Sequence, residues 1–97
     1  MEGIIRDNKE KNQYEMDSEG STARLEYIIA KNQIYLTHTE VPPPLGGKGV
    51  GSSMVRQVLE DIDKRELTLI PLCPFVALYI KRNPEWVKLV MKGINIA

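Results

Sequence analysis

The chain has 97 residues, 42% hydrophobic and 27% charged, a composition typical of one small globular domain that excludes a large separate substrate domain. Its 13 basic and 13 acidic side chains cancel, so no overall charge draws it to nucleic acid or to an anionic membrane. A single cysteine cannot form an internal disulfide, and no apolar run reaches the roughly 18 residues of a membrane span. Because the N-terminus is also too polar for a signal peptide, we expect a cytoplasmic protein.

The first half of the chain predicts an antiparallel meander of short strands. Residues 3–8 and 12–17 are typical of a hairpin divided by a polar turn. Alternating apolar and polar residues then predict strands at 23–30 and 34–41, with a tight polar turn between them. Short connections of this kind favour antiparallel neighbours over crossovers.

The strand at 34–41 carries the only histidine of the chain. Simple alternation puts Ile34, Leu36 and His38 on one face, so His38 could be a hydrogen-bonded core residue. A neutral imidazole near a cleft could instead deprotonate an incoming amine. Glu40 is a rival base on the same face.

The second half of the chain predicts helices and one further strand. Prolines 42–44 end the preceding strand, because proline gives a β-ladder no donor. Apolar residues at helical spacing predict a helix over 51–64. A nearly continuous apolar run at 67–73 indicates a strand buried on both faces. A helix over 75–82 follows, and 85–92 could add one or two helical turns.

The most distinctive segment is Leu45-Gly46-Gly47-Lys48-Gly49-Val50-Gly51-Ser52-Ser53, between an expected strand and an expected helix. A glycine-rich turn there directs several backbone N–H groups at one point, and the helix N-terminus adds partial positive charge. Ser52 or Ser53 could cap the helix. The segment therefore predicts a phosphate or pyrophosphate site, although alone it could be a tight turn before a capped helix. A Walker loop is not supported, because Lys48 precedes a glycine.

The strands 34–41 and 67–73, joined by the helix 51–64, form a βαβ unit, whose strands should run parallel. Ligands in such sheets bind beyond the carboxyl ends of the strands. We therefore expect residues 38–41, the glycine-rich segment and Cys73 to surround one cleft.

A set of sequence blocks, in this order, resembles a known family. The blocks are His38-Thr39-Glu40-Val41-Pro42, Gly47-Lys48-Gly49-Val50-Gly51, Pro71-Leu72-Cys73-Pro74-Phe75-Val76, Tyr79-Ile80 and Asn83-Pro84-Glu85. They are similar to a minimal GNAT-like family, whose small members lack the first helices of full-length GNAT acyltransferases. Gly46 stands where the Q/R-x-x-G-x-G/A signature of the superfamily begins with Arg or Gln. The resemblance therefore implies weaker cofactor binding, which the charge of Lys48 would offset.

The resemblance implies an α+β fold with a mixed, mostly antiparallel sheet, whose fourth and fifth strands splay apart to admit acetyl-CoA or coenzyme A. The pantetheine arm would pair with the fourth strand, and the pyrophosphate would lie on the glycine-rich amides. Arg82, with Lys81 and Lys88, could meet the adenosine phosphate, or these side chains could form a solvated face. The predicted cofactor-binding residues are Thr39, Glu40, Val41, Gly46, Gly47, Lys48, Gly49, Val50, Gly51, Ser52, Cys73, Tyr79, Arg82 and Asn83.

The predicted activity is transfer of an acetyl group from acetyl-CoA to a primary amine of a small molecule or a protein. Backbone N–H groups near a strand bulge would stabilise the oxyanion. The predicted catalytic residues are Cys73, Tyr79 and His38, of which Tyr79 would protonate the leaving thiolate. A non-catalytic CoA- or acyl-CoA-binding module is the alternative function. We expect no metal, nucleic-acid or membrane partner, and a monomer or weak dimer.

Two of these side chains also have plain structural interpretations. A helix N-terminus stabilises a thiolate, so Cys73 could be a nucleophile or base, but a lone cysteine is more often a small buried hydrophobe. Tyr79 and Phe75, four residues apart, could be core aromatics on one helix face. Trp86 is expected to anchor the C-terminal segment by packing.

Overall fold

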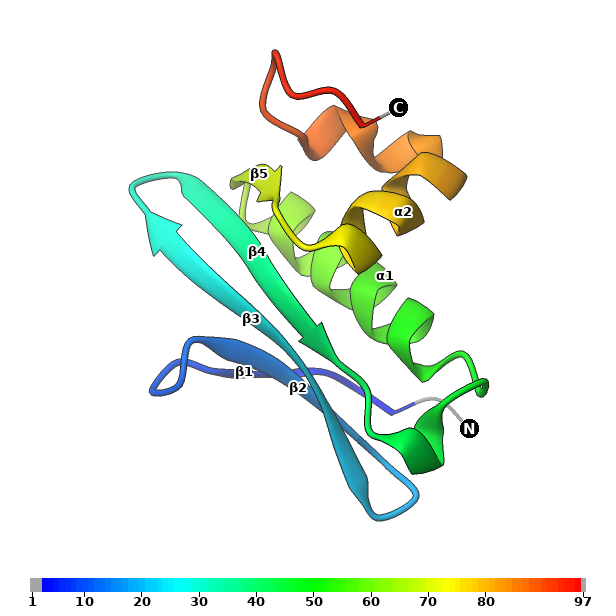
Figure 1. Ribbon diagram of the computed structural model, residues 1–97. Helices are drawn as coiled ribbons and strands as arrows, with labels where there is room; N and C mark the ends of the chain where they lie inside the picture. The colour runs from blue at the N-terminus through cyan, green and yellow to red at the C-terminus, as the bar shows by residue number, and fades with distance from the viewer. Residues whose placement is uncertain (1–2, 97) are drawn as a thin grey trace.

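The computed structural model describes residues 3–96 and contains a five-stranded sheet in the order β1-β2-β3-β4-β5 (Figure 1). Strands β1 to β4 pair antiparallel, and β5 pairs parallel with β4. This arrangement confirms the predicted meander and the mixed sheet of an α+β fold. The strands are β1 (Arg6–Asn8), β2 (Gln13–Ser18), β3 (Ser21–Ala30), β4 (Gln33–Glu40) and β5 (Thr68–Pro71).

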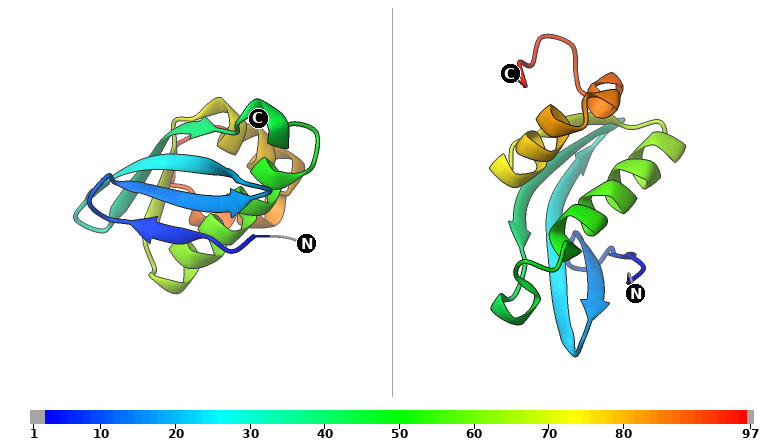
Figure 2. Two further views of the ribbon diagram at one scale, coloured as in Figure 1. Left: turned by 90° about the horizontal axis from the view of Figure 1, so that it is seen from below. Right: turned by 90° about the vertical axis from the view of Figure 1, so that its right-hand side faces the viewer.

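The described residues also contain two α-helices and two 3₁₀ turns: η1 (Pro43–Leu45), α1 (Val50–Lys64), α2 (Pro74–Arg82) and η2 (Pro84–Leu89). Helix α1 connects β4 to β5 and lies across one face of the sheet, while α2 lies beside β5 (Figures 1 and 2). The predicted βαβ unit is therefore present. Within residues 3–96, neither helix has the length and apolar character needed to cross a bilayer.

The core lies between the apolar stripe of α1 and the facing side of the sheet, as the spacing of apolar residues in the sequence predicts. One cluster joins both helices to β2, β3, β4 and β5. Trp86 packs against it from η2, as expected. The buried residues of α1 are Val50, Gly51, Met54, Val55, Val58, Leu59 and Ile62.

A β-bulge in β4 changes the simple alternation of its side chains. Tyr27 of β3 pairs with Leu36, but its neighbour Glu26 pairs with His38. Thr37 therefore has no opposite residue, and its hydroxyl donates to the carbonyl oxygen of Glu26 at 3.2 Å. An extra residue of this kind reverses which side chains face the core.

Beyond the bulge, Thr39 takes the inner side of β4 and His38 the outer side. Thr39 pairs with the buried Leu25, whereas the side chain of His38 is 53% exposed. The expectation that His38 shares the face of Leu36 is therefore wrong, because the bulge inserts one residue between them. Glu40 lies on the outer side with His38, as predicted.

Strands β4 and β5 separate part of the way along β4. Their last register pair is Leu36 with Pro71, and the carbonyl oxygen of Leu36 then accepts from the N–H groups of both Leu72 and Cys73, at 3.0 and 2.9 Å. Within the described residues, 37–40 have no β-partner on the β5 side. The predicted splay of the fourth and fifth strands is thus present.

A partly buried polar network joins the N-terminal strands to α1. The hydroxyl of Tyr14 donates to Asp61 at 2.7 Å and accepts from Arg65 at 3.1 Å, and the hydroxyl of Tyr27 donates to Asp7 at 2.6 Å. The two rings lie 5.3 Å apart. Burial, followed by the hydrogen bond to a carboxylate, raises the pKa of Tyr14 and raises the pKa of Tyr27 to about 12.

This network predicts loss of stability in alkali. An unfolded tyrosine loses its proton near pH 10, whereas folded Tyr27 keeps it to about pH 12, so the stability that Tyr27 contributes is complete below pH 10 and is lost as pH rises toward 12. We expect Tyr27→Phe to remove about 1 kcal/mol of the decline between about pH 9 and pH 11. Urea unfolding at stepped pH measures this. Tyr35→Phe, outside the network, is the control, and an unchanged slope in Tyr27→Phe would contradict the prediction.

Candidate functional site

The glycine-rich loop ends at a left-handed helix cap. Gly47 and Gly49 have φ angles of +77° and +76°, which favour glycine because other residues meet a steric penalty there. Gly49 is the N-cap of α1, and its carbonyl oxygen accepts from the N–H of Ser53 at 3.0 Å. The prediction that Ser52 or Ser53 caps the helix is wrong, because no side chain among the described residues caps α1.

The loop and the first turn of α1 contain a group of backbone amides that no carbonyl oxygen of the described residues accepts from. The amides of Gly46 and Lys48 are engaged within the loop, with the carbonyl oxygens of Pro43 and Leu45 at 3.0 and 3.3 Å. Free donors at the positive end of a 15-residue helix attract an anion. Within residues 3–96, the amides without an intramolecular acceptor include those of Gly47, Gly49, Val50, Gly51 and Ser52.

A hollow lined by Glu19 and Lys48 lies on one side of these donors, and two hollows that adjoin each other lie on the side of α2. Of these two, the first, of about 280 Å³, lies between Val41 at the end of β4, the glycine loop and Phe75 at the start of α2. The second, of about 340 Å³, continues along α2. Both hollows are bordered by Ser52 and Phe75. The further residues that line the second hollow are Leu78, Tyr79, Arg82 and Asn83.

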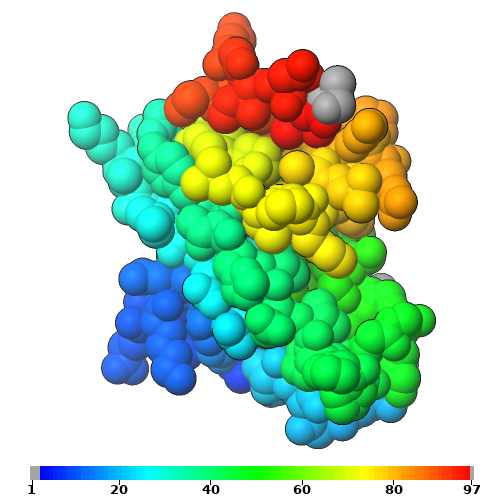
Figure 3. Space-filling model, in the orientation of Figure 1, coloured from blue at the N-terminus to red at the C-terminus, as the bar shows by residue number. Residues whose placement is uncertain are grey.

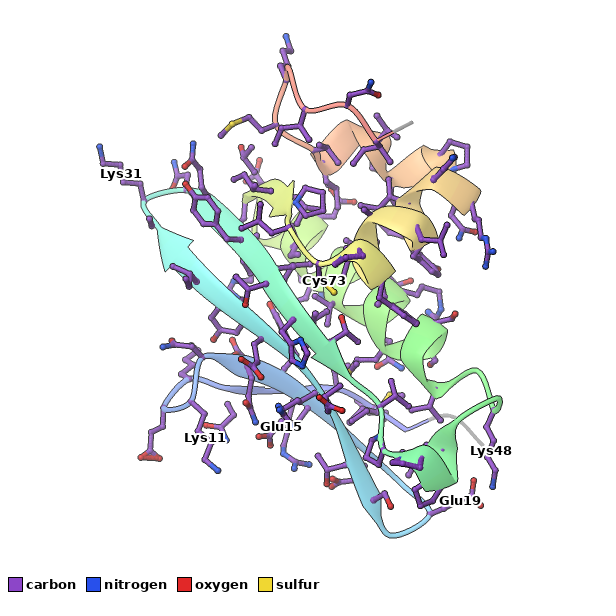
Figure 4. The ribbon with its side chains drawn as sticks, in the orientation of Figure 1. Lys11, Glu15, Glu19, Lys31, Lys48 and Cys73 are labelled. Carbon is purple, nitrogen blue, oxygen red and sulfur yellow. The ribbon has the colours of Figure 1, made fainter. Side chains whose placement is uncertain are left out.

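Lys48 points away from the first hollow. Its ammonium lies 2.9 and 3.0 Å from the two carboxylate oxygens of Glu19, in the turn between β2 and β3 (Figure 4). The backbone of the loop therefore lies between the lysine charge and the predicted pyrophosphate position. The sequence suggested that Lys48 offsets the missing side chain at Gly46, whereas in this conformation Glu19 neutralises it.

Removing the carboxylate of Glu19 should release this charge. If the loop holds the pyrophosphate of coenzyme A, as the sequence resemblance predicts, Glu19→Gln should tighten that binding about two- to fivefold, since an exposed ion pair is worth below about 1 kcal/mol and the freed ammonium can turn toward the loop. Isothermal titration calorimetry at low salt measures the change. Lys48→Met is the paired variant and should abolish the gain when combined with Glu19→Gln. A gain that persists in the double variant would rule out this explanation.

Cys73 lies at the inner end of the splay, between β4 and α2 (Figure 4). It is 4% exposed, and its sulfur lies 3.1 Å from the hydroxyl oxygen of Thr39. Its backbone caps α2, because its carbonyl oxygen accepts from the N–H of Ala77 at 3.0 Å. The thiol is thus a buried residue, as its plain interpretation predicts, and it also touches the predicted pantetheine strand.

His38 and Glu40 form an exposed pair on the opposite face of β4. Nε2 of His38 lies 3.0 Å from Oε1 of Glu40, and Arg24 lies 3.9 Å from the same oxygen. The hydrogen bond from His38, with the charge of Arg24, holds the pKa of the Glu40 carboxyl below its usual value. A lowered pKa makes Glu40 a weaker base. Figure 3 shows this side of the molecule, where β4 lies at the surface between α2 and the N-terminal strands.

Tyr79 is half-buried in the wall of the second hollow. Burial raises its pKa, an effect that the nearby charge of Arg56 partly opposes, so the hydroxyl keeps its proton at neutral pH. Within the described residues this hydroxyl has no hydrogen-bond partner. The backbone carbonyl oxygen of Tyr79 accepts a hydrogen bond from the side-chain amide of Asn83 at 2.9 Å, and this bond closes the end of α2.

The three basic side chains of the predicted adenosine-phosphate site, Arg82, Lys81 and Lys88, do not converge on one position. Arg82 lines the second hollow, but the ammonium of Lys88 lies 3.4 Å from Asp63 and 5.9 Å from the centre of the Trp86 ring. Lys81 is exposed on α2. Of the three cations, Arg82 is therefore the one that borders a hollow beside the loop.

Sequence reasoning missed the role of Phe75 in the walls of both hollows. The fully buried side chains of α2 are Val76 and Ile80, whereas Phe75 is 41% exposed and Leu78 is also exposed. The interpretation of Phe75 as a core aromatic is therefore wrong. The spacing of Val76 and Ile80 was the available signal, since it fixes the buried stripe and leaves Phe75 beside it.

A sheet that opens between two parallel strands, beside a glycine-rich helix start, defines a GNAT-like domain. A family model described as GCN5-related N-acetyl-transferase matches residues 13–89. The chain therefore belongs to the GCN5-related N-acetyltransferase family.

Individual proteins are similar to this chain over different lengths. Protein NATD1 of Homo sapiens and of Gallus gallus are each 29% identical over 56 residues, which are 58% of this chain and 50% and 51% of those proteins. The chain thus spans about half the length of the curated relatives it matches. The NMR structure of a GCN5-like protein from Staphylococcus aureus superposes with a TM-score of 0.70 and 25% identity, covering 98% of this chain and 94% of that one.

Proposed function

We propose that this chain transfers an acetyl group from acetyl-CoA to a primary amine. The observation that carries the proposal is the position of the free amides of the glycine loop, which lie at the mouth of the gap between β4 and β5. One anion-binding site and one unpaired strand edge then lie together, as a cofactor with a pyrophosphate and an amide-containing arm requires.

The residues around the gap fit that cofactor in distinct ways. The backbone amides of residues 49–52 would hold the pyrophosphate, and the backbone amide of Gly47 would lie beside them. The backbone of residues 39–41, which β5 leaves unpaired, would bond the amides of the pantetheine arm. Acetyl-CoA supplies an acetyl group activated as a thioester. Arg82, at the far end of the second hollow, would meet a further phosphate.

The side chains near the gap would transfer protons and position the pantetheine arm. Tyr79, protonated at neutral pH and without a partner among the described residues, would donate a proton to a thiolate. Cys73, bonded to Thr39, would set the inner limit of the arm. His38, exposed on the outer face, would take the proton of an amine that approaches from that side. The amides at the bulge, near Thr37, would bond the oxyanion.

An NMR titration of backbone amides with acetyl-CoA tests the cofactor assignment, with ATP at the same concentration as control. We expect shifts to concentrate at 38–41, 46–53 and 73–83, and ATP not to reproduce them. Saturating acetyl-CoA that leaves the glycine-loop amides unmoved would overturn the cofactor assignment and the activity with it.

A second measurement separates turnover from binding. We would measure the release of free coenzyme A in the presence of polyamines, amino sugars and lysine peptides. The same assay would be run on the unaltered chain and on the Tyr79→Phe and Cys73→Ala variants. Amine-dependent release that falls in Tyr79→Phe supports acetyl transfer. Loop shifts without release by any amine would make the chain a CoA-binding module instead.

A further inference from the structure

We propose that the ring of Phe75 is a plug in the gap between β4 and α2, and that the pantetheine arm of the cofactor displaces it on entry. This inference rests on the proposed function, because the plug closes the path that the cofactor would take. It assigns a role in cofactor admission to a side chain that takes no part in the proposed proton transfers.

The first step is the position of the ring. A Cβ built on Gly51, in the first turn of α1, would lie 2.7 Å from Cζ of Phe75 and 3.2 Å from Cγ2 of Val41. The tip of the ring therefore reaches the helix backbone directly beside the end of β4. The gap that opens beyond Leu36 is filled at this level by the ring.

The second step is the relation of the ring to the two hollows. Phe75 borders both the hollow at the glycine loop and the hollow along α2 that contains Tyr79. Ser52 also borders both, but from the side of α1. Rotation of the ring away from Gly51 would join the two spaces into one groove, which runs from the free amides toward Tyr79.

The third step is that the ring is partly exposed to solvent, whereas the side chains that anchor its helix are buried. Phe75 is 41% exposed, whereas Val76 and Ile80 of the same helix are fully buried and hold α2 in place. Below the ring, the contact of Cys73 with Thr39 closes the inner end of the gap. Glycine at position 51 leaves room for the ring in the closed position, because any larger residue there would meet it.

Fluorine NMR tests this inference directly, because Phe75 is the only phenylalanine of the chain. The protein labelled with 4-fluorophenylalanine gives one resonance that reports this ring. We expect coenzyme A and phosphopantetheine each to shift it more than adenosine 3′,5′-bisphosphate does, because the bisphosphate lacks the pantetheine arm and would reach only Arg82 in the second hollow. Glycine-loop amides that shift with saturating coenzyme A while the fluorine resonance stays fixed would overturn the plug and leave the proposed function intact. If neither moves, the cofactor does not enter and both fail.

Association kinetics give an independent measure on unlabelled protein. If the ring leaves the gap open about a tenth of the time, Phe75→Ala should raise the rate constant for coenzyme A association roughly tenfold. Val87→Ala, an exposed apolar truncation in η2 that borders neither hollow, is the control and should change the rate less than twofold. An association rate in Phe75→Ala that equals that of the control would contradict the plug.

Discussion

Gly49→Val should weaken acetyl-CoA binding about tenfold or more, the largest effect that one substitution in the loop is expected to have. Gly49 has a φ of +76° at the N-cap of α1. A β-branched residue in this left-handed region is strained by roughly 1–3 kcal/mol, so the loop relaxes to another conformation. The amides of 49–52 then no longer converge on one anion. Calorimetric titration with acetyl-CoA measures the loss.

Gly93→Val is the matched control for backbone strain. Gly93 has a φ of +96° and open space around its Cα, but it lies near the end of the chain and borders neither hollow. It should lower the melting temperature without changing acetyl-CoA affinity. Equal losses of affinity in both variants would mean that strain anywhere in the fold, and not the loop geometry, controls binding.

The strand order was predictable because the connections between the early strands are short. Turns between 8 and 13, 18 and 21, and 30 and 33 leave little alternative to antiparallel neighbours. The parallel β5 followed from a helix of sufficient length between two apolar runs. These features depend on local patterns that one sequence contains.

The face of His38 was not predictable, because a bulge is a property of two strands. Thr37 is an ordinary strand residue by composition, and only its pairing with β3 shows that it is the extra one. After Thr37, each side chain of β4 lies on the face opposite to the one that simple alternation predicts. The same shift brings Thr39, and not His38, into contact with Cys73.

Long-range contacts account for the other differences at the site. Lys48 and Glu19 are separated by 29 positions and meet because the β2–β3 turn reaches the glycine loop. No local sequence pattern predicts an ion pair between residues so far apart in the chain. The loop itself was predictable, since glycine content and the following helix are local, but the direction in which its lysine points was not.

The second large effect concerns stability, where Leu69→Ala should lower the free energy of unfolding by about 2–5 kcal/mol. Leu69 is fully buried in β5. It pairs with Ile34 of β4 on one side and bridges to Val90 on the other, and its carbonyl oxygen accepts from the N–H of Met91 at 2.9 Å. Truncation leaves a cavity where the sheet, α1 and the C-terminal segment meet. For a small domain with about 5–15 kcal/mol in total, this is a large share of the stability.

Leu72→Ala removes the same atoms three positions later, where the side chain is 60% exposed. Its effect on stability should stay within about 0.5 kcal/mol, because most of the side chain is already exposed to solvent. Urea unfolding of both variants measures the difference. Because β5 ends at Pro71, the two variants also compare a position inside the core with a position beside the gap. Equal destabilisation by the two substitutions would mean that Leu72 is covered in solution.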